Sequence, residues 1–195
     1  MKNRATLIFS VLALLLFASC DKDETRIPDF LVEFATIIKT ESSVRIKLDN
    51  GNVLSPEDPF DFDVENGNRV IINYTPLENS VIKVNRIEQI FLGEIKIKED
   101  PNEVKSEPIK IISIWSRGSY LNLSFQVDYH SKAHSVALLK DTQSNTNKLY
   151  IVYSREDDPA GAPTLRHLSF NIESLKNEGF TVYINTNNGE RKFDF

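Results

Sequence analysis

Cysteine is almost absent from this chain, since Cys20 is the only one among 195 residues. A single thiol excludes an intrachain disulfide and any metal site built from several cysteines. Positive charge is also in short supply, with 23 Lys and Arg against 28 Asp and Glu and a net charge of -5. An acidic balance disfavours nucleic acid, because phosphate binding needs a basic face. It equally disfavours direct attraction to anionic lipid.

Long hydrophobic runs are missing as well, apart from one at the start of the chain. Leu7 to Phe17 is apolar except for Ser10, and Lys2 and Arg4 precede it. The run is too short for a membrane-spanning helix and has the flanks of a secretory signal peptide. We therefore predict a cleaved signal peptide at residues 1–19, whose removal leaves the rest of the chain still more acidic.

Cys20 follows the small residues Ala18 and Ser19, which resembles a bacterial lipobox. This pattern predicts lipidation of Cys20 and a tether over residues 20–30. The alternative is an ordinary signal peptide followed by a chance cysteine.

The charged residues after Cys20 suggest where the protein is delivered. Lys22, Asp23 and Glu24 resemble the surface-export signal of Bacteroidetes lipoproteins, whereas Asp21 in other bacteria would suggest retention at the inner membrane. We favour the export signal, and so expect a protein of the cell outer membrane, lipid-anchored and exposed at the surface.

The remaining chain has the pattern of short β-strands. In 43–49 and in 120–129, apolar residues alternate with polar ones, which is typical of half-buried strands. Asn50-Gly51 predicts a tight two-residue hairpin, and no amphipathic stretch is long enough for a stable helix. Short strands separated by turn signals favour an all-β sandwich or barrel.

Residues 98–108 form the best candidate for a domain boundary, because they are charged, lack aromatics and contain Pro101 and Pro108. We accordingly expect one domain at 31–100 and a second at 108–195. Within the preceding strand region, 81–97, Gly93 predicts a bend or a bulge.

Several blocks along the chain resemble the NigD-like lipoproteins of Bacteroidetes. After the lipobox come LDNGNVL, RVIINYT at 69–75, VIKVNRI at 81–87, WSRGSYLNLSF at 115–125 and LRHLSFNI at 165–172. The resemblance implies an N-terminal OB-like small barrel followed by a C-terminal β-sandwich. The family is named after a bacteriocin gene cluster in which an immunity role was proposed, and it offers no catalytic residues to carry over. Fold alone does not define chemistry.

Trp115, Arg117 and Tyr120 are the candidate binding residues. Aromatic side chains next to an arginine are typical of binding hot spots. The other interpretation, which we favour, makes Trp115 a core residue of the sandwich and the remainder a hairpin turn, since large aromatics dominate core burial.

Two clusters invite a metal interpretation, and we predict no metal or cofactor at either. Asp61, Asp63 and Glu65 alternate in the acidic loop 57–65, but the EF-hand pattern fails, so only a looser calcium site stays open. His130 and His134 are four residues apart, but lie between strands and have no glutamate between them, unlike a zinc protease helix.

Catalytic motifs are also missing. The chain has neither a G-x-S-x-G elbow nor a glycine-rich phosphate loop. Acidic pairs such as Asp157-Asp158 exist, but their sequence does not show that two carboxylates converge on one substrate.

We therefore expect a non-catalytic binding protein that is held to the membrane through lipid on Cys20. Its ligand would be a bacteriocin-like protein or a glycan, and not a nucleic acid. A structural or accessory subunit of an outer-membrane complex is the alternative, and a glycan or peptide hydrolase is a third.

Overall fold

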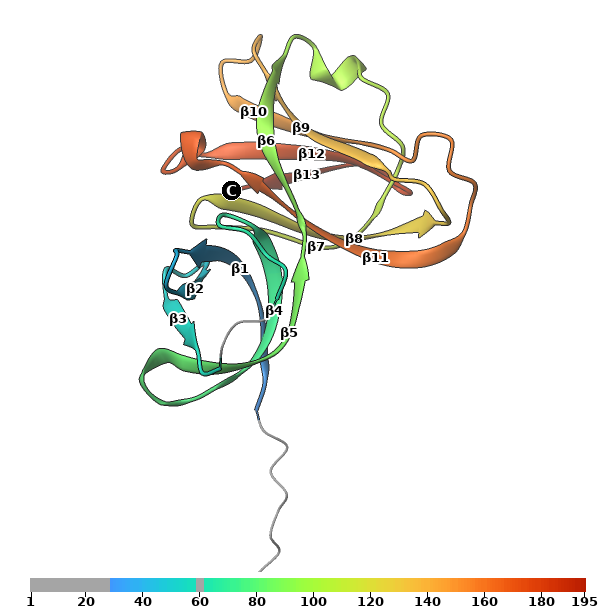
Figure 1. The fold of residues 1–195 in the computed structure, drawn as a ribbon. Coiled ribbons are helices and arrows are strands. Elements are labelled where there is room, and N and C mark those ends of the chain that lie inside the picture. Colours follow the sequence, from blue (N-terminus) through green and yellow to red (C-terminus); the bar gives the residue numbers. More distant parts are fainter. Residues whose placement is uncertain (1–28, 59–61) are drawn as a thin grey trace, which may run out of the picture.

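The structure is a computed structural model, and it describes residues 29–58 and 62–195. The predicted signal peptide, Cys20, the export signal at Lys22, Asp23 and Glu24, and Asp61 of the acidic loop lie outside the described residues. Figure 1 shows two β-structures stacked on one another, a small barrel formed by the first five strands and a larger body formed by the other eight.

Strands and short 3-10 turns make up the regular structure of the described residues. The barrel strands are β1 (Leu31–Lys39), β2 (Val44–Leu48), β3 (Val53–Pro56), β4 (Arg69–Pro76) and β5 (Val81–Gln89). The others are β6 (Phe91–Lys98), β7 (Lys110–Arg117), β8 (Tyr120–Tyr129), β9 (Ser135–Asp141), β10 (Asn147–Ser154), β11 (Ala162–Asn171), β12 (Phe180–Thr186) and β13 (Gly189–Asp194). Single 3-10 turns lie at Glu78–Ser80, Pro101–Glu103 and Glu173–Leu175.

The first body is a closed barrel with strand order β1-β2-β3-β5-β4, in which β4 pairs with β1 to close the ring. All of its pairings are antiparallel except the short parallel one between β3 and β5. Alternate apolar residues of each strand point inward and fill the barrel, as period-two patterning requires. Its core consists of Ala35, Ile37, Ile46, Leu48, Val64, Val70, Ile72, Tyr74 and Ile82. This confirms the expected small N-terminal barrel.

The second body is one curled eight-stranded sheet with the order β13-β12-β10-β9-β6-β11-β8-β7, and we call it the sheet domain. β6 forms the corner, because its first half pairs with β11 and its second half with β9, both in parallel. The sheet therefore folds over on itself as a sandwich around a shared apolar core. The expected alternation in β8 holds, since Leu121, Leu123, Phe125 and Val127 all lie in that core.

The structure differs from the expected domain limits at β6. We expected residues up to 100 to belong to the barrel, yet Phe91–Lys98 pairs only with strands of the sheet domain. The chain passes from one body to the other at Ile90, the single residue between β5 and β6. The segment 98–108 instead connects β6 to β7 within the sheet domain, so the expected boundary there is wrong.

Gly93 lies within β6 and has a packing role. A Cβ atom there would stand 2.6 Å from two ring carbons of Phe170, so only glycine leaves room for that buried ring. The pairing of β6 with β11 continues across Gly93 without a register shift. Gly93 therefore marks the close approach of the Phe170 side chain, and β6 has no bulge at this residue.

The expected hairpin at Asn50-Gly51 is present with a different length. Leu48 and Asn52 are joined by a backbone hydrogen bond of 2.9 Å, which leaves a three-residue loop, Asp49 to Gly51. Gly51 has a φ of 93°, as the third residue of such a loop requires. The additional residue, Asp49, has its side chain in the contact between the two bodies.

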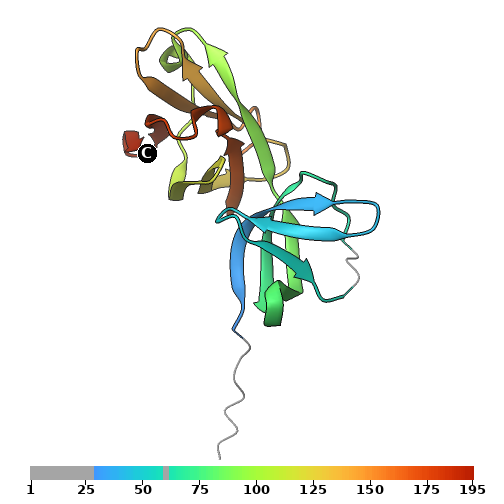
Figure 2. The same ribbon diagram turned by 90° about the vertical axis from the view of Figure 1, so that its left-hand side faces the viewer.

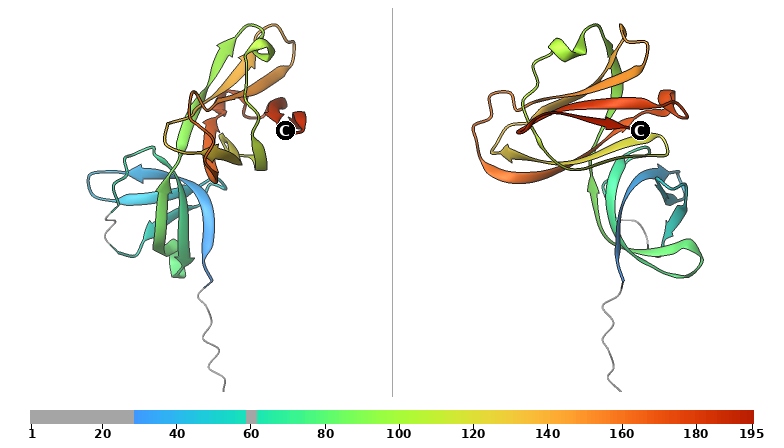
Figure 3. Two further views of the ribbon diagram at one scale, coloured as in Figure 1. Left: turned by 90° about the vertical axis from the view of Figure 1, so that its right-hand side faces the viewer. Right: turned by 180° about the vertical axis from the view of Figure 1, so that it is seen from behind.

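The barrel packs against one layer of the sandwich. Figures 2 and 3 show that the strands β7, β8 and β11 face the barrel, while β10, β12 and β13 lie beyond them. Outward-facing polar residues of β8 and β11 are therefore covered by protein, among them Asn122, Ser124 and Ser169, which are all buried.

Candidate functional site

A buried arginine joins the barrel to the sheet domain. Arg69, the first residue of β4, has 1% relative exposure. Its guanidinium binds both carboxylate oxygens of Asp49 at 2.7 and 2.8 Å, and it also donates to Thr36 at 3.1 Å. Across the junction, Arg69 donates to the Asn122 Oδ1 atom at 3.1 Å and to the Ser169 Oγ atom at 3.2 Å. The bidentate geometry is the strongest form of an arginine-carboxylate pair.

The other polar atoms of this network are hydrogen-bonded to one another. Asn122 donates to Asp49 at 2.8 Å, and Ser169 donates to Asn122 at 2.6 Å. Among the described residues, no buried side-chain nitrogen or oxygen lacks a partner. A complete buried network of this kind fixes one arrangement of the groups it connects. The two bodies therefore meet in a defined orientation.

Tyr120, one of the predicted binding residues, belongs to this junction. The Arg69 guanidinium lies over its ring, 3.8 Å from the centroid, and Thr36 of β1 donates a hydrogen bond of 3.1 Å to its hydroxyl. A cation close to an aromatic face is attracted by the ring quadrupole. Tyr120 therefore contributes to holding the barrel in place.

Trp115 also lies at the junction, outside the apolar core of the sheet domain. Its ring meets that of Phe34 of β1 edge to face, with centroids 4.9 Å apart and an interplanar angle of 88°. Phe34 also packs on His167, with centroids 5.9 Å apart. Our favoured interpretation of Trp115 as a sandwich core residue is therefore wrong. The side of β7 that carries Trp115 therefore faces the barrel.

Arg117 is the one member of the predicted trio that is exposed, and no other described residue pairs with its side chain. It lies with Trp115 on a cavity of about 270 Å³ beside the junction. We call this cavity the junction groove, and its lining is Val32, Glu33, Phe34, Asp49, Asn50, Trp115 and Arg117. Val32 is 56% exposed, so the groove has an open apolar edge next to an unpaired cation.

A second buried carboxylate lies at the far end of the sheet domain. Asp158 is 2% exposed and accepts hydrogen bonds from the backbone N–H groups of His130, Ser131 and Lys132 at 3.0 to 3.2 Å. His134 adds a bond of 2.9 Å from its Nε2 atom. Despite an opposing effect of burial, these hydrogen bonds hold the pKa of Asp158 well below its usual range.

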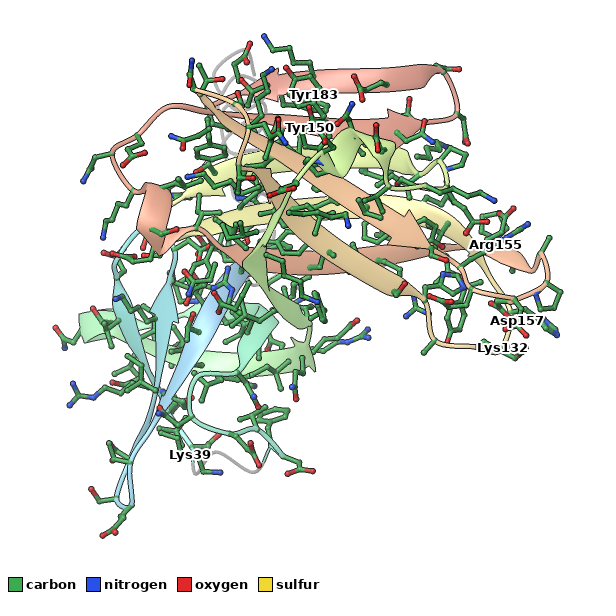
Figure 4. All side chains as sticks on the ribbon, turned by 90° about the horizontal axis from the view of Figure 1, so that it is seen from above. Lys39, Lys132, Tyr150, Arg155, Asp157 and Tyr183 are labelled. Carbon is green, nitrogen blue, oxygen red and sulfur yellow. The ribbon has the colours of Figure 1, made fainter. Side chains whose placement is uncertain are left out.

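The neighbours of His134 define its tautomer. Because Asp158 is ionised and only accepts, the proton lies on Nε2, and the Nδ1 atom accepts from the Tyr153 hydroxyl at 2.5 Å. Burial raises the pKa of Tyr153 to about 12, so this hydroxyl keeps its proton. Figure 4 shows the loops concerned, with Lys132, Arg155 and Asp157 near one another and far from Lys39 of the barrel.

Next to His134 lies a cavity of about 480 Å³, which we call the sheet pocket. Apolar and aromatic side chains form most of it, and Lys96 and Arg166 are the charged residues on it. The lining is Phe91, Lys96, Phe125, Val127, Tyr129, Ala133, His134, Ser135, Val136, Tyr153, Arg166, His167 and Leu168. Neither the sequence motifs nor the alternation of the strands pointed to this pocket, because its residues come from β6, β8, β9, β10, β11 and the loop that precedes β9.

The histidines do not form a serine-histidine-carboxylate constellation in the described part of the chain. The accepting nitrogen of His134, Nδ1, takes its hydrogen bond from the buried hydroxyl of Tyr153, and no serine or threonine hydroxyl bonds to it. His167 is 2.8 Å from the hydroxyl of the buried Ser124, but no carboxylate binds the other nitrogen of His167. Burial lowers the pKa of His167, although Glu88 opposes this.

Metal ligands do not gather in residues 29–58 and 62–195, where we find no group of three or more His, Cys, Asp or Glu side chains suited to an ion. His130 is exposed and its backbone supports Asp158, so its side chain is not brought to a common site with His134. The calcium interpretation of the acidic loop depends in part on Asp61, which is outside the described residues.

Comparison with known families identifies the family of this chain. The model of the NigD-like C-terminal beta sandwich domain matches residues 94–195. The chain belongs to the NigD-like family. The match begins inside β6, which agrees with the assignment of this strand to the sheet domain. No curated protein matches the NigD-like chain.

Solved structures share the fold of the whole described chain. A protein of Parabacteroides distasonis, named as a candidate toxin-related protein, is 23% identical with a TM-score of 0.75 and covers 86% of this chain and 92% of its own. A NigD-like immunity protein of Bacteroides caccae is 20% identical, with a TM-score of 0.64 and coverage of 86% and 92%.

A candidate lipoprotein of Bacteroides fragilis is 12% identical, with a TM-score of 0.66 and coverage of 85% and 97%. At these identities the three likenesses show a common fold. In the described residues, no helix is both long and apolar enough to span a bilayer.

Proposed function

We propose that this NigD-like protein is a non-catalytic, lipid-anchored binding protein of the cell envelope that captures a protein toxin. The observation that carries the proposal is the junction groove, where an aromatic pair, an exposed valine and an unpaired arginine lie together on a rigid support. Tryptophan and arginine are enriched among residues that dominate protein-protein binding energies. The buried Arg69 network holds both walls of the groove in fixed positions, which lowers the entropic cost of binding.

The chemistry of the groove defines its partner. Val32 and Trp115 offer apolar contact, and Arg117 offers a charge without a partner. The two carboxylates on the groove already have partners, since Glu33 accepts from Tyr74 and Asp49 from Arg69. A complementary protein would therefore present an apolar side chain beside a carboxylate. The immunity role named for one similar structure, and the toxin relation named for another, support a toxin as that partner.

The test uses the soluble chain from residue 21 as bait in supernatant from competitor cultures, together with survival of cells that carry the full chain. We expect a toxin to bind the wild type and the Arg45→Glu control, and to be lost with Arg117→Glu. Arg45 and Arg117 are both exposed, and neither forms an ion pair with another described residue. Arg45→Glu is therefore a matched control, because both reversals change the net charge by the same amount. Equal binding by both variants, or equal killing with and without the protein, would reject the proposal.

The anchor has its own test. Cys20→Ala is expected to abolish incorporation of labelled fatty acid, and joint replacement of Lys22, Asp23 and Glu24 by alanine to keep lipidation but lose surface exposure. Recovery of an envelope complex in place of a toxin would favour the accessory-subunit alternative.

A further inference from the structure

The sheet pocket differs from the rest of the surface in its charge. Lys96 and Arg166 line it, and none of its lining residues is an aspartate or a glutamate. Neither cation forms an ion pair or a side-chain hydrogen bond with any other residue in 29–58 or 62–195. In a chain of net charge -5, two unpaired cations on one cavity are a local reversal of sign.

Arg166 is held in a geometry suited to an anion. Its guanidinium lies over the ring of Tyr129, 4.1 Å from the centroid. This contact with the ring uses none of the N–H donors of Arg166, and such donors match the two oxygens of a carboxylate.

The rest of the pocket is apolar. Phe125, Val127 and Leu168 are core residues of the sheet domain, and they also line the cavity. Phe91 lies on the same cavity and is 49% exposed. A volume of about 480 Å³ falls within the range in which proteins bind small organic ligands.

Several other polar groups of the wall are already hydrogen-bonded. His134 gives both ring nitrogens to Asp158 and Tyr153, and the Asp158 carboxylate is turned away to three backbone N–H groups. The charged donors left for a ligand are therefore Arg166 and Lys96.

We propose that the sheet pocket binds an amphipathic monoanion that has a carboxylate head on an unbranched apolar chain. Arg166 and Lys96 receive the carboxylate, and the side chains of Phe91, Phe125, Val127 and Leu168 surround the apolar chain. The site is separate from the junction groove, so either proposal can fail without the other.

The test is calorimetric titration of the soluble chain, from residue 21, with dodecanoate and with dodecan-1-ol. We expect dodecanoate to bind the wild type, and Arg166→Gln to weaken it about tenfold or more, as loss of a charge-assisted pair requires. Lys96→Gln should weaken it less, and Lys83→Gln, an exposed lysine of β5, should have no effect. Dodecan-1-ol should bind more weakly and respond little to Arg166→Gln.

A second variant tests the location without touching a charge. Ala133 is exposed and lines the pocket, so Ala133→Trp should obstruct the cavity while preserving the fold. Dodecanoate binding that survives this change, or that is equal for dodecan-1-ol and insensitive to Arg166→Gln, would overturn the proposal. Absence of dodecanoate binding up to about 1 mM would overturn it as well.

Discussion

Asp49 and Asp158 are both carboxylates with little exposure, but the protein stabilises them in different ways. Asp49 is paired with Arg69, a cation that keeps its charge at any ordinary pH, and the pair joins two bodies. Asp158 is held by three backbone N–H groups and His134, all within one body. The first arrangement fixes how domains are oriented, and the second fixes the course of the loops next to the sheet pocket.

Loss of Arg69 is expected to have the largest effect. Arg69→Ala leaves Asp49 buried without its cation and removes donors to Asn122 and Ser169. Breaking a buried ion pair from one side typically costs about 3–5 kcal/mol in the free energy of unfolding. Urea denaturation should show this loss.

The control for this change is Arg86→Ala, which removes an arginine whose side chain is 76% exposed and paired with Glu88. An exposed pair contributes about 0–1 kcal/mol. If both variants lose the same small amount, the junction is not the stabilising contact that we describe.

Loss of the Asp158 charge is expected to have the second-largest effect on stability, and this effect depends on pH. The pKa of Asp158 is lowered in the folded protein, so its carboxylate stabilises the fold above the ordinary aspartate pKa of about 4. That contribution declines as pH falls below this value towards the lower folded pKa. Asp158→Asn should therefore unfold at lower urea than wild type at pH 7, and the difference should shrink as pH falls below about 4.

Asp157→Asn is the matched control, because Asp157 is the adjacent residue and its side chain is 81% exposed. It should follow the wild type at each pH. A gap between wild type and Asp158→Asn that is unchanged at low pH would contradict the assigned charge of this site.

The aromatic contact of the junction should give the smallest effect. Phe34→Leu keeps an apolar side chain but loses the edge-to-face contacts with Trp115 and His167. Such a pair contributes about 0.5–1.5 kcal/mol beyond burial. Tryptophan fluorescence should also change, because Trp115 is the single tryptophan of the chain.

Val53→Ala, on an exposed barrel residue, serves as the control for Phe34→Leu. It should leave both the stability and the fluorescence close to those of the wild type. An unchanged emission spectrum in Phe34→Leu would show that Trp115 does not depend on the barrel for its surroundings.

Local sequence patterns predicted much of the fold. Strand β8 shows what such a pattern can predict and what it cannot. The apolar residues of this strand were correctly expected to face a core, because alternation with period two indicates a strand with one apolar face and one polar face. The same alternation made Asn122 and Ser124 look solvent-exposed, whereas the barrel buries both. The sequence pattern of a strand is the same whether its polar face lies against water or against a polar interface.

The contacts that join the two bodies could not be predicted, since they are distant in sequence. Arg69 lies 20 residues from Asp49, 53 from Asn122 and 100 from Ser169. In the sequence, Arg69 is simply the polar start of a strand and Asp49 the start of a turn. The place of β6 was missed for a similar reason, because both of its parallel partners follow much later in the chain.

The position of β1 gives the protein a mechanical property. It is the first strand after the predicted tether, it is paired with β2 and β4, and its Phe34 and Thr36 contact the sheet domain. Antiparallel hydrogen bonds run perpendicular to the strands, so a pull along β1 from its N-terminal end loads both ladders in shear. Many hydrogen bonds then share the force. A force applied through the predicted tether is therefore resisted by the whole barrel and by the layer of the sheet domain that packs against it.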